Sequence, residues 1–103
     1  MAAKVGVVFG SDSDWVVMQA CVEQLDAFGV EADVQIMSSH RSPTKVYEYA
    51  SGAAGRGLEV IIAGAGMSAA LAGTIAAVTR LPVIGVPIAS GPSAGSEIRT
   101  AAA

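Results

Sequence analysis

Ser38-Ser39-His40-Arg41-Ser42-Pro43 is the stretch from which the fold of this sequence is most readily inferred, and it holds the only histidine. A strand-like run, Glu31 to Ile36, precedes it, and a helical pattern begins near Pro43. In open α/β sheets, ligands bind beyond the carboxyl ends of the strands. Hydroxyls, an imidazole and a guanidinium at such a strand end therefore predict an α/β fold with a ligand site at this point.

The rest of the chain alternates strand and helix patterns around this stretch. Strands are predicted at Lys4–Phe9, Ala32–Met37, Leu58–Ile62 and Pro82–Val86. Helices are predicted at Trp15–Phe28, from Pro43 to the glycines at 55 and 57, and at roughly Ser68–Thr79. This alternation is typical of a parallel sheet joined by right-handed crossovers. We expect residues 1–103 to form a single domain.

All three predicted helices have an apolar face, which in the third consists of Leu71, Ile75 and Val78. In the first, apolar residues recur at intervals of three and four, which predicts packing through Met18, Cys21, Val22, Leu25 and Phe28. Gly29 suits the position that ends this helix. The second helix has a face of small residues at Val46, Ala50, Ala53 and Ala54.

Composition and charge exclude several classes of protein. The net charge of −3, without a Lys/Arg cluster, argues against nucleic acid as a partner. The sequence has neither an apolar run of ~18 residues nor a signal peptide, so we expect no membrane partner and a cytoplasmic protein. One cysteine and one histidine cannot form a zinc site, so no metal is expected. A hydrophobic fraction of 52% with 15% charged residues favours burial against other copies, hence a homo-oligomer.

Three loops are predicted to meet at one edge of the sheet. Because the carboxyl ends of parallel strands share an edge, the segments after the first three strands should converge: Gly10–Asp14, Ser38–Pro43 and Ala63–Met67. These segments carry serine hydroxyls, an imidazole, a guanidinium and the free amides of helix N-termini. The inventory predicts a pocket for a phosphorylated, sugar-like ligand.

The residues of these loops offer distinct chemistry. Ser11 and Ser13, with the first amides of the following helix, can surround a phosphate. Asp14 can accept hydrogen bonds from ligand hydroxyls. Arg41 presents a planar fork that suits a phosphate, and His40 can take up and release a proton near neutral pH.

Structural interpretations of the same residues remain open. Ser11, Ser13 and Asp14 are also typical helix caps. Arg41 could be a surface arginine, and His40 a solvated loop histidine. The Ala63–Gly66 segment lacks the third glycine of a dinucleotide fingerprint, so a tight strand-to-helix turn is an equally good interpretation.

Four ordered motifs give the sequence a specific likeness. They are Gly10-Ser-x-Ser-Asp-Trp15, Ser38-x-His-Arg-x-Pro43, Val60-Ile-Ile-Ala-Gly-Ala-Gly66 and Leu81-Pro-Val-Ile-Gly-Val-Pro87. In register from about Lys4 to Gly91, the chain resembles the 5-(carboxyamino)imidazole ribonucleotide mutase family, also known as the catalytic subunit of phosphoribosylaminoimidazole carboxylase. The resemblance implies a flavodoxin-like three-layer sandwich with a parallel sheet, truncated after about four strands. It also implies a homo-octamer with active sites at subunit interfaces.

The same resemblance implies a function and its residues. The reaction is a cofactor-free transfer of a carboxylate from the exocyclic nitrogen to C4 of an imidazole ribonucleotide, in de novo purine biosynthesis. His40 corresponds to the catalytic acid/base that handles the C4 proton. The substrate-binding positions carried over are Ser11, Ser13 and Arg41 for the phosphate, Asp14 for the ribose, Ser38 in the pocket wall, and Ala63, Gly64 and Gly66 beside the base and carboxylate.

Two departures from the family keep other functions open. The family's Ala-His-Leu-x-Gly run is Ala69-Ala70-Leu71-Ala72-Gly73 here, so Ala70 stands in place of a histidine. After Gly95 the sequence no longer follows the family, and we expect its C-terminal strand and helices to be lacking. The alternatives are a carboxylase that joins free carbon dioxide to aminoimidazole ribonucleotide, and a non-catalytic truncated relative that binds a phosphorylated ribonucleotide.

Overall fold

The structure, a computed structural model, describes residues 3–66 and 70–88. In this part of the chain strands and helices alternate as predicted: β1 (Val5–Phe9), α1 (Trp15–Ala27), β2 (Ala32–Ile36), α2 (Pro43–Gly52), β3 (Val60–Ala65), α3 (Ala70–Ala76) and β4 (Val83–Pro87). Short 3-10 turns at Asp12–Asp14 and Ala54–Arg56 precede α1 and follow α2. No helix in the described ranges is long and apolar enough to span a membrane.

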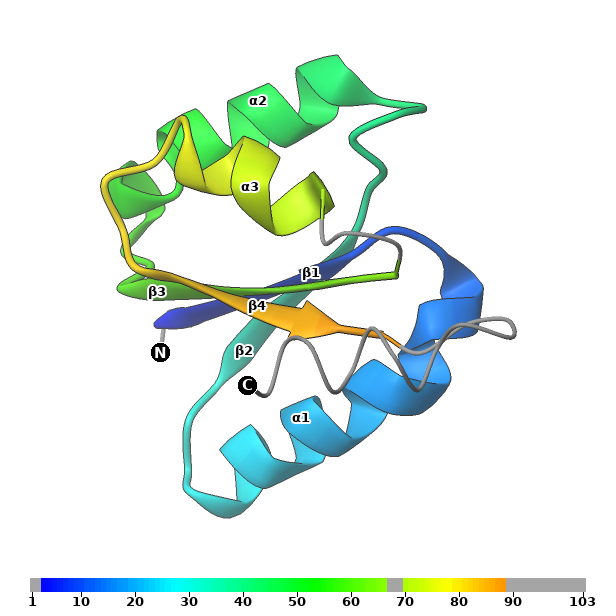
Figure 1. The fold of residues 1–103 in the computed structure, drawn as a ribbon. Coiled ribbons are helices and arrows are strands. Elements are labelled where there is room, and N and C mark those ends of the chain that lie inside the picture. The colour runs from blue at the N-terminus through cyan, green and yellow to red at the C-terminus, as the bar shows by residue number, and fades with distance from the viewer. Residues whose placement is uncertain (1–2, 67–69, 89–103) are drawn as a thin grey trace, which may run out of the picture.

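The four strands are parallel and form one sheet in the order β2-β1-β3-β4. Helix α1 covers one face of the sheet, and α2 and α3 cover the other (Figure 1). Because β1 lies between two strands and two helical layers, all five of its residues are buried. Its valines suit this position because β-branched side chains pack well on a pleated surface. The predicted three-layer α/β fold with a parallel sheet is confirmed.

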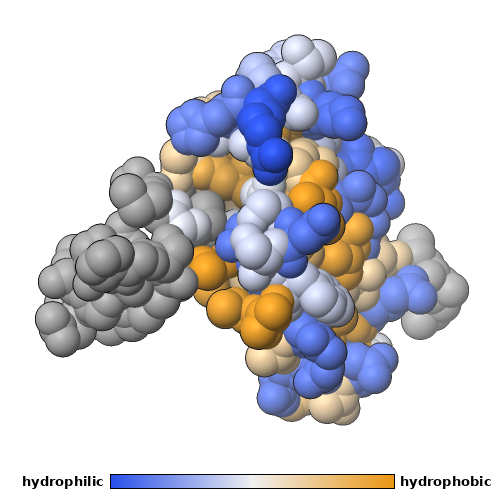
Figure 2. Space-filling view, turned by 90° about the vertical axis from the view of Figure 1, so that its right-hand side faces the viewer, coloured by the Kyte–Doolittle hydropathy of each residue, from blue (hydrophilic) through white to orange (hydrophobic). Residues whose placement is uncertain are grey.

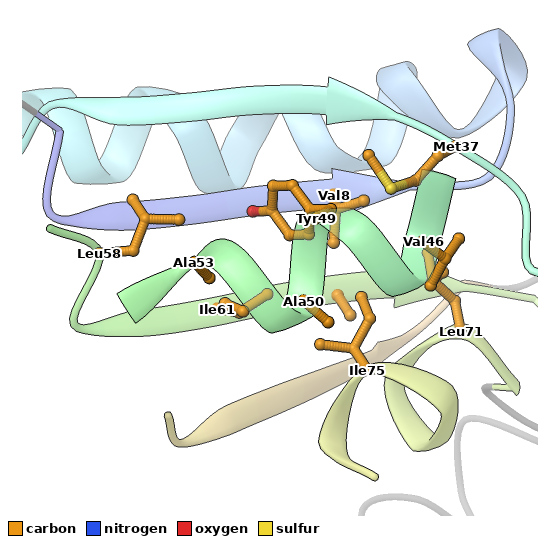
Figure 3. Packing of buried hydrophobic residues seen from close by; sticks show 11 residues of the cluster. Val8, Met37, Val46, Tyr49, Ala50, Ala53, Leu58, Ile61, Leu71 and Ile75 are labelled. Carbon is orange, nitrogen blue, oxygen red and sulfur yellow. The ribbon is translucent and has the colours of Figure 1, made fainter. Parts of the chain in front are cut away.

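A hydrophobic core lies on each face of the sheet. On the side of α2 and α3, Val46, Ala50 and Ile75 pack with Val8 and Ile61 (Figure 3). On the side of α1, the buried residues are Val5, Val7, Phe9, Met18, Ile62 and Ile88. A fully buried aliphatic or aromatic side chain contributes about 1.5–3 kcal/mol. Burial of these apolar side chains therefore holds both helical layers against the sheet.

Helix α1 packs and ends largely as its sequence indicates. Met18 is fully buried, and Cys21 and Leu25 are partly buried against the sheet. Gly29 has a φ of 73°, a conformation that side chains disfavour, and closes the helix as predicted. The prediction for Phe28 is wrong. Its side chain is 73% exposed because the helix ends one residue earlier and the C-cap no longer follows the buried face.

The third strand and the second helix have different bounds from those predicted. Strand β3 runs from Val60 to Ala65, whereas the sequence predicts Leu58–Ile62 followed by a turn. Alanine and glycine are weak strand formers, but β3 pairs with β1 on one side and β4 on the other, and these ladders extend it. Helix α2 ends at Gly52, so Ala54 lies in an exposed turn and not on the packed face.

The Tyr49 hydroxyl is buried without a hydrogen-bond partner among the described residues. Helix α2 places the ring against the sheet (Figure 3), with the hydroxyl over Gly6 of β1, where a larger residue would collide with it. Burial and the nearby Asp33 carboxylate raise the pKa of Tyr49 to about 12. The hydroxyl therefore stays protonated, and its lost hydration is not offset by a protein hydrogen bond.

Replacing Tyr49 with Phe is expected to stabilise the protein. A buried polar group without a partner costs about 1–3 kcal/mol, so the free energy of unfolding should rise by about 1 kcal/mol near neutral pH. An unfolded tyrosine titrates near pH 10 and the folded Tyr49 at about 12, so the stability that this proton provides is lost as the pH rises through that window. The Phe variant lacks this alkaline loss.

Urea denaturation near neutral pH and at about pH 11 measures both effects of the Tyr49→Phe substitution. Tyr47→Phe is the matched control because the Tyr47 side chain is 59% exposed, and its removal should change little. A Tyr49→Phe protein that is less stable than the parent would contradict the unpartnered state of the hydroxyl.

Candidate functional site

A cavity of about 350 Å³ opens at the carboxyl edge of the sheet. Its wall is formed by Gly10, Ser11, Asp14, Met37, Ser38, Ser39, His40, Gly66, Ala70 and Leu71. Segments that follow β1, β2 and β3 therefore meet here, as predicted. Figure 2 views this edge of the molecule, where hydrophobic residues are exposed between hydrophilic ones. The neighbouring strands β1 and β3 lead to helices on opposite faces, and the crevice at such a point is the usual ligand site of open α/β sheets.

The first loop presents hydroxyls and a carboxylate. The hydroxyl oxygens of Ser11 and Ser13 are hydrogen-bonded to each other at 2.8 Å. The backbone N–H of Asp14 donates to the Ser11 carbonyl oxygen at 3.0 Å, which closes the 3-10 turn. Ser11 and Asp14 hold N-cap positions, but neither side chain makes a capping bond in the described part of the chain. Both side chains line the cavity instead, which weakens the capping interpretation.

The second loop is folded around Ser38. The backbone N–H groups of His40 and Arg41 both donate to Ser38 Oγ, each at 3.2 Å. The N–H of Ser42 donates to the Ser38 carbonyl oxygen at 2.8 Å. Helix α2 then begins at Pro43, as predicted. The loop reverses direction within a few residues because one serine accepts these bonds.

His40 and Arg41 have different surroundings. His40 is exposed to solvent and lines the cavity. The Arg41 side chain is not part of the cavity wall, since its Nη2 donates to the Gly10 carbonyl oxygen at 3.0 Å. Arg41 therefore links the second loop to the first and holds a positive charge beside it.

The third predicted segment reaches the cavity only at its end. Ala63 and Gly64 lie inside β3, where Ala63 is fully buried and Gly64 packs against α1. Gly66, directly after the strand, lines the cavity, as does Ala70 at the start of α3. Residues 67–69, which include the predicted start of the third helix, lie outside the described residues.

The structure sorts the residues that the sequence proposes for the site. Those that line the cavity are Ser11, Asp14, Ser38, His40 and Gly66. Those that do not line it are Ser13, which bonds to Ser11, Arg41, which bonds to Gly10, and Ala63 and Gly64, which lie within β3. Five lining residues were not among those that the sequence proposes for the site: Gly10, Met37, Ser39, Ala70 and Leu71. The available signal was position, since Met37 follows a strand end and Leu71 lies in the first turn of a helix that borders the site.

Few charged groups face the cavity. Among the lining residues that the structure describes, Asp14 supplies a carboxylate and His40 an imidazole. Within residues 3–66 and 70–88, no three His, Cys, Asp or Glu side chains are arranged to hold a metal ion. The arrangement can bind a polar ligand through hydroxyls, backbone amides and a carboxylate, and it can move a proton through the imidazole.

The fold and the cavity define an open α/β protein whose candidate ligand site lies beyond the carboxyl ends of a parallel sheet. The chain belongs to the AIR carboxylase family, whose model matches residues 4–98. It is 56% identical over 88 residues to the N5-carboxyaminoimidazole ribonucleotide mutase of Mycobacterium tuberculosis, and 57% identical over 88 residues to that of Aquifex aeolicus. Each alignment covers 85% of this chain but 51% and 53% of the relatives, so the chain spans about half the length of the curated relatives it matches.

A solved structure has the same fold. The crystal structure of Treponema denticola PurE superposes with a TM-score of 0.79 at 26% identity, and the match covers 96% of this chain and 63% of that one. The family resemblance that the four motifs carry is therefore confirmed, together with the parallel α/β fold.

Proposed function

We propose that this chain is an N5-carboxyaminoimidazole ribonucleotide mutase, an isomerase of de novo purine biosynthesis. The observation that carries the proposal is the meeting of Ser11, Asp14, Ser38 and His40 at one cavity, at the carboxyl edge of the sheet. The relatives from Mycobacterium tuberculosis and Aquifex aeolicus bear the name of this mutase and share more than half of the aligned residues with the chain.

The phosphate of the ribonucleotide binds at the first loop in this proposal. Ser11 and Ser13 form a hydroxyl pair there, and the guanidinium of Arg41 is bonded to the same loop. These are donors of the kind that hold a phosphate. Asp14 accepts hydrogen bonds from the ribose hydroxyls, and Ser38 forms part of the pocket wall.

The ring and its carboxylate lie toward the end of β3. Gly66 lines the cavity there and, having no side chain, leaves room for a planar group. Ala63 and Gly64 contribute through the shape of the strand, because both lie within β3 and Ala63 is fully buried.

One proton-transfer group is enough for this reaction. The exocyclic N–C bond breaks, carbon dioxide is released inside the cavity, and the nitrogen takes a proton. C4 of the ring then forms a bond to the carbon dioxide and gives up its own proton. His40 supplies the first proton and accepts the second, so it returns to its initial state without a cofactor. Retention of carbon dioxide beside the ring replaces a bimolecular step by an effectively unimolecular one.

A carboxylase that uses free carbon dioxide would need the same site. Its chemistry is the second half of the reaction described above, in which C4 bonds to carbon dioxide and His40 takes the proton. The two activities differ only in the substrate that enters. The two activities are separated by measuring product formation from the carboxyamino compound and from aminoimidazole ribonucleotide plus bicarbonate. Faster turnover of aminoimidazole ribonucleotide plus bicarbonate would favour the carboxylase.

Ala70 favours a second candidate function, a non-catalytic relative that binds a phosphorylated ribonucleotide. Ala70 lines the cavity at a position where the family resemblance implies a histidine. A methyl group there can neither donate a hydrogen bond nor move a proton. Ser11, Ser13 and Arg41 would still offer donors to a phosphate.

The first test follows loss of the 4-carboxy-aminoimidazole ribonucleotide spectrophotometrically, with the 103-residue protein, beside calorimetric titration of the same compound. Turnover supports the enzyme. Binding without turnover supports the non-catalytic relative. A folded protein that neither binds nor turns over the compound would contradict both candidates.

The chain is also expected to self-associate as a homo-oligomer. Large apolar side chains exposed on the described part of the chain include Val16, Val17, Phe28, Ile36, Tyr47 and Ile84. A contiguous patch of such residues would mark a contact surface, and the family resemblance implies an octamer with sites between subunits. Light scattering measures the mass in solution, and a mass equal to one chain would contradict this expectation.

A further inference from the structure

One residue accepts the backbone hydrogen bonds of the loop that carries His40. Ser38 Oγ accepts the N–H groups of His40 and Arg41 at 3.2 Å, and the Ser38 carbonyl oxygen accepts the N–H of Ser42 at 2.8 Å. The next residue, Pro43, has no amide proton. Every backbone amide proton of residues 40–43 is therefore bonded to Ser38.

Neither neighbouring element supplies these bonds. The backbone ladder between β1 and β2 is continued by the N–H of Met37, which donates to the Phe9 carbonyl oxygen at 2.9 Å. Helix α2 begins at Pro43, and the amides before a helix have no helical carbonyl to bond to. A serine hydroxyl that accepts amides two and three residues further on can set such a turn by itself.

We infer that Ser38 is a positioning residue that acts through His40: its hydroxyl oxygen holds the loop so that the imidazole lies in the cavity wall. The inference rests on the proposed function for its catalytic consequence. Ser38 is partly buried whereas His40 is exposed, so the anchor lies inside the loop and the acid/base lies at its surface. Loss of the anchor frees the backbone of His40, and a misplacement of about 1 Å can lower a rate roughly 100-fold.

Arg41 strengthens this arrangement at the other side of the loop. Its side chain bonds to the Gly10 carbonyl oxygen at 3.0 Å, while its backbone N–H is held by Ser38 Oγ. His40 therefore lies between an anchor at Ser38 and a tie to the first loop. The Arg41–Gly10 hydrogen bond cannot replace the bonds to Ser38 Oγ, because it fixes residue 41 and leaves the amide of residue 40 without an acceptor.

Steady-state kinetics of the Ser38→Ala and Ser38→Thr variants test the catalytic consequence. Ser38→Ala removes the acceptor, so kcat should fall by roughly 10- to 100-fold while KM changes by less than about threefold. Ser38→Thr retains a hydroxyl and should keep most of kcat. Ser51→Ala, on the exposed side of α2, is the control and should change neither constant. A raised KM with kcat preserved would overturn the inference, because it assigns Ser38 to substrate binding alone.

Amide hydrogen exchange, measured by NMR on the protein without substrate, tests the anchor separately. Exchange of the His40 and Arg41 amides should be faster in Ser38→Ala than in the parent, while Ser38→Thr and Ser51→Ala stay close to the parent. Unchanged exchange in Ser38→Ala would overturn the inference whatever the turnover. Faster exchange in Ser38→Ala, together with a parent protein that shows no turnover, would leave the role of Ser38 in the loop in place and remove the proposed function.

Discussion

In the His40→Asn variant, kcat is expected to fall by about 10²–10⁴-fold while the ligand still binds. Asparagine can form hydrogen bonds but cannot take up a proton at neutral pH. The substitution leaves the fold intact because His40 is exposed and lines the cavity. It also leaves the loop intact, since the bond from residue 40 to Ser38 uses the backbone N–H. The loss is therefore confined to proton transfer.

Turnover and calorimetric binding of the 4-carboxy-aminoimidazole ribonucleotide measure the two halves of this prediction. Kd should stay within about threefold of the parent value. Gln24→Asn, exposed on α1, serves as the surface control and should match the parent in both measurements. An unchanged rate in His40→Asn would exclude the imidazole from the chemistry, and lost binding would assign it to holding the substrate.

The Gly64→Ala substitution is expected to lower the free energy of unfolding by about 1–3 kcal/mol. A Cβ at this position would lie 2.5 Å from Met18 Sδ and 3.1 Å from Ile88 Cδ1. Met18 is fully buried and Ile88 nearly so, which leaves little room for either to move. Gly64 also pairs with Phe9 in the ladder between β1 and β3, so the strand cannot shift away from α1 without loss of backbone bonds.

Gly73→Ala is the matched control for this prediction. Gly73 lies on the exposed side of α3, and nothing lies within 4 Å of an added Cβ there. Alanine in a helix should raise stability by roughly 0.5–1 kcal/mol. Urea denaturation compares the two variants. A Gly64→Ala protein as stable as the parent would show that Met18 moves aside at little cost. If the collision with Met18 is the cause, Gly64→Ala should lower the free energy of unfolding by less in a Met18→Ala background.

Most of the architecture could be predicted because its signals are local. The valine-rich run of β1 indicates a strand buried on both faces, and Gly29 marks a helix end because its φ is positive. The extent of β3 could not be predicted in this way. Ala63 and Gly64 favour a turn by composition, and they belong to the strand because β1 and β4 offer hydrogen-bonding edges on both sides.

The place of the candidate site could be predicted more securely than its wall. Parallel topology alone brings the ends of β1, β2 and β3 to one edge, so the convergence of His40 and Ser11 follows from the order of the elements. The orientation of each side chain does not follow from the order of the elements. The Arg41 side chain bonds to the Gly10 carbonyl oxygen, which depends on the distance between two loops that are far apart in sequence. The Ser13 hydroxyl bonds to that of Ser11, which depends on the local side-chain rotamers.

Strand β2 is the outer strand on one side of the sheet, and its side chains become more exposed along its length until Ile36 is 49% exposed. A strand that buries so little apolar surface separates from its neighbour at a smaller free-energy cost than a central strand such as β1. The loop with His40 follows directly from β2, so a local opening of this strand would carry the imidazole away while the rest of the core stays folded. Thermal inactivation would then precede thermal unfolding, and the attachment of one strand would set the working temperature of the protein.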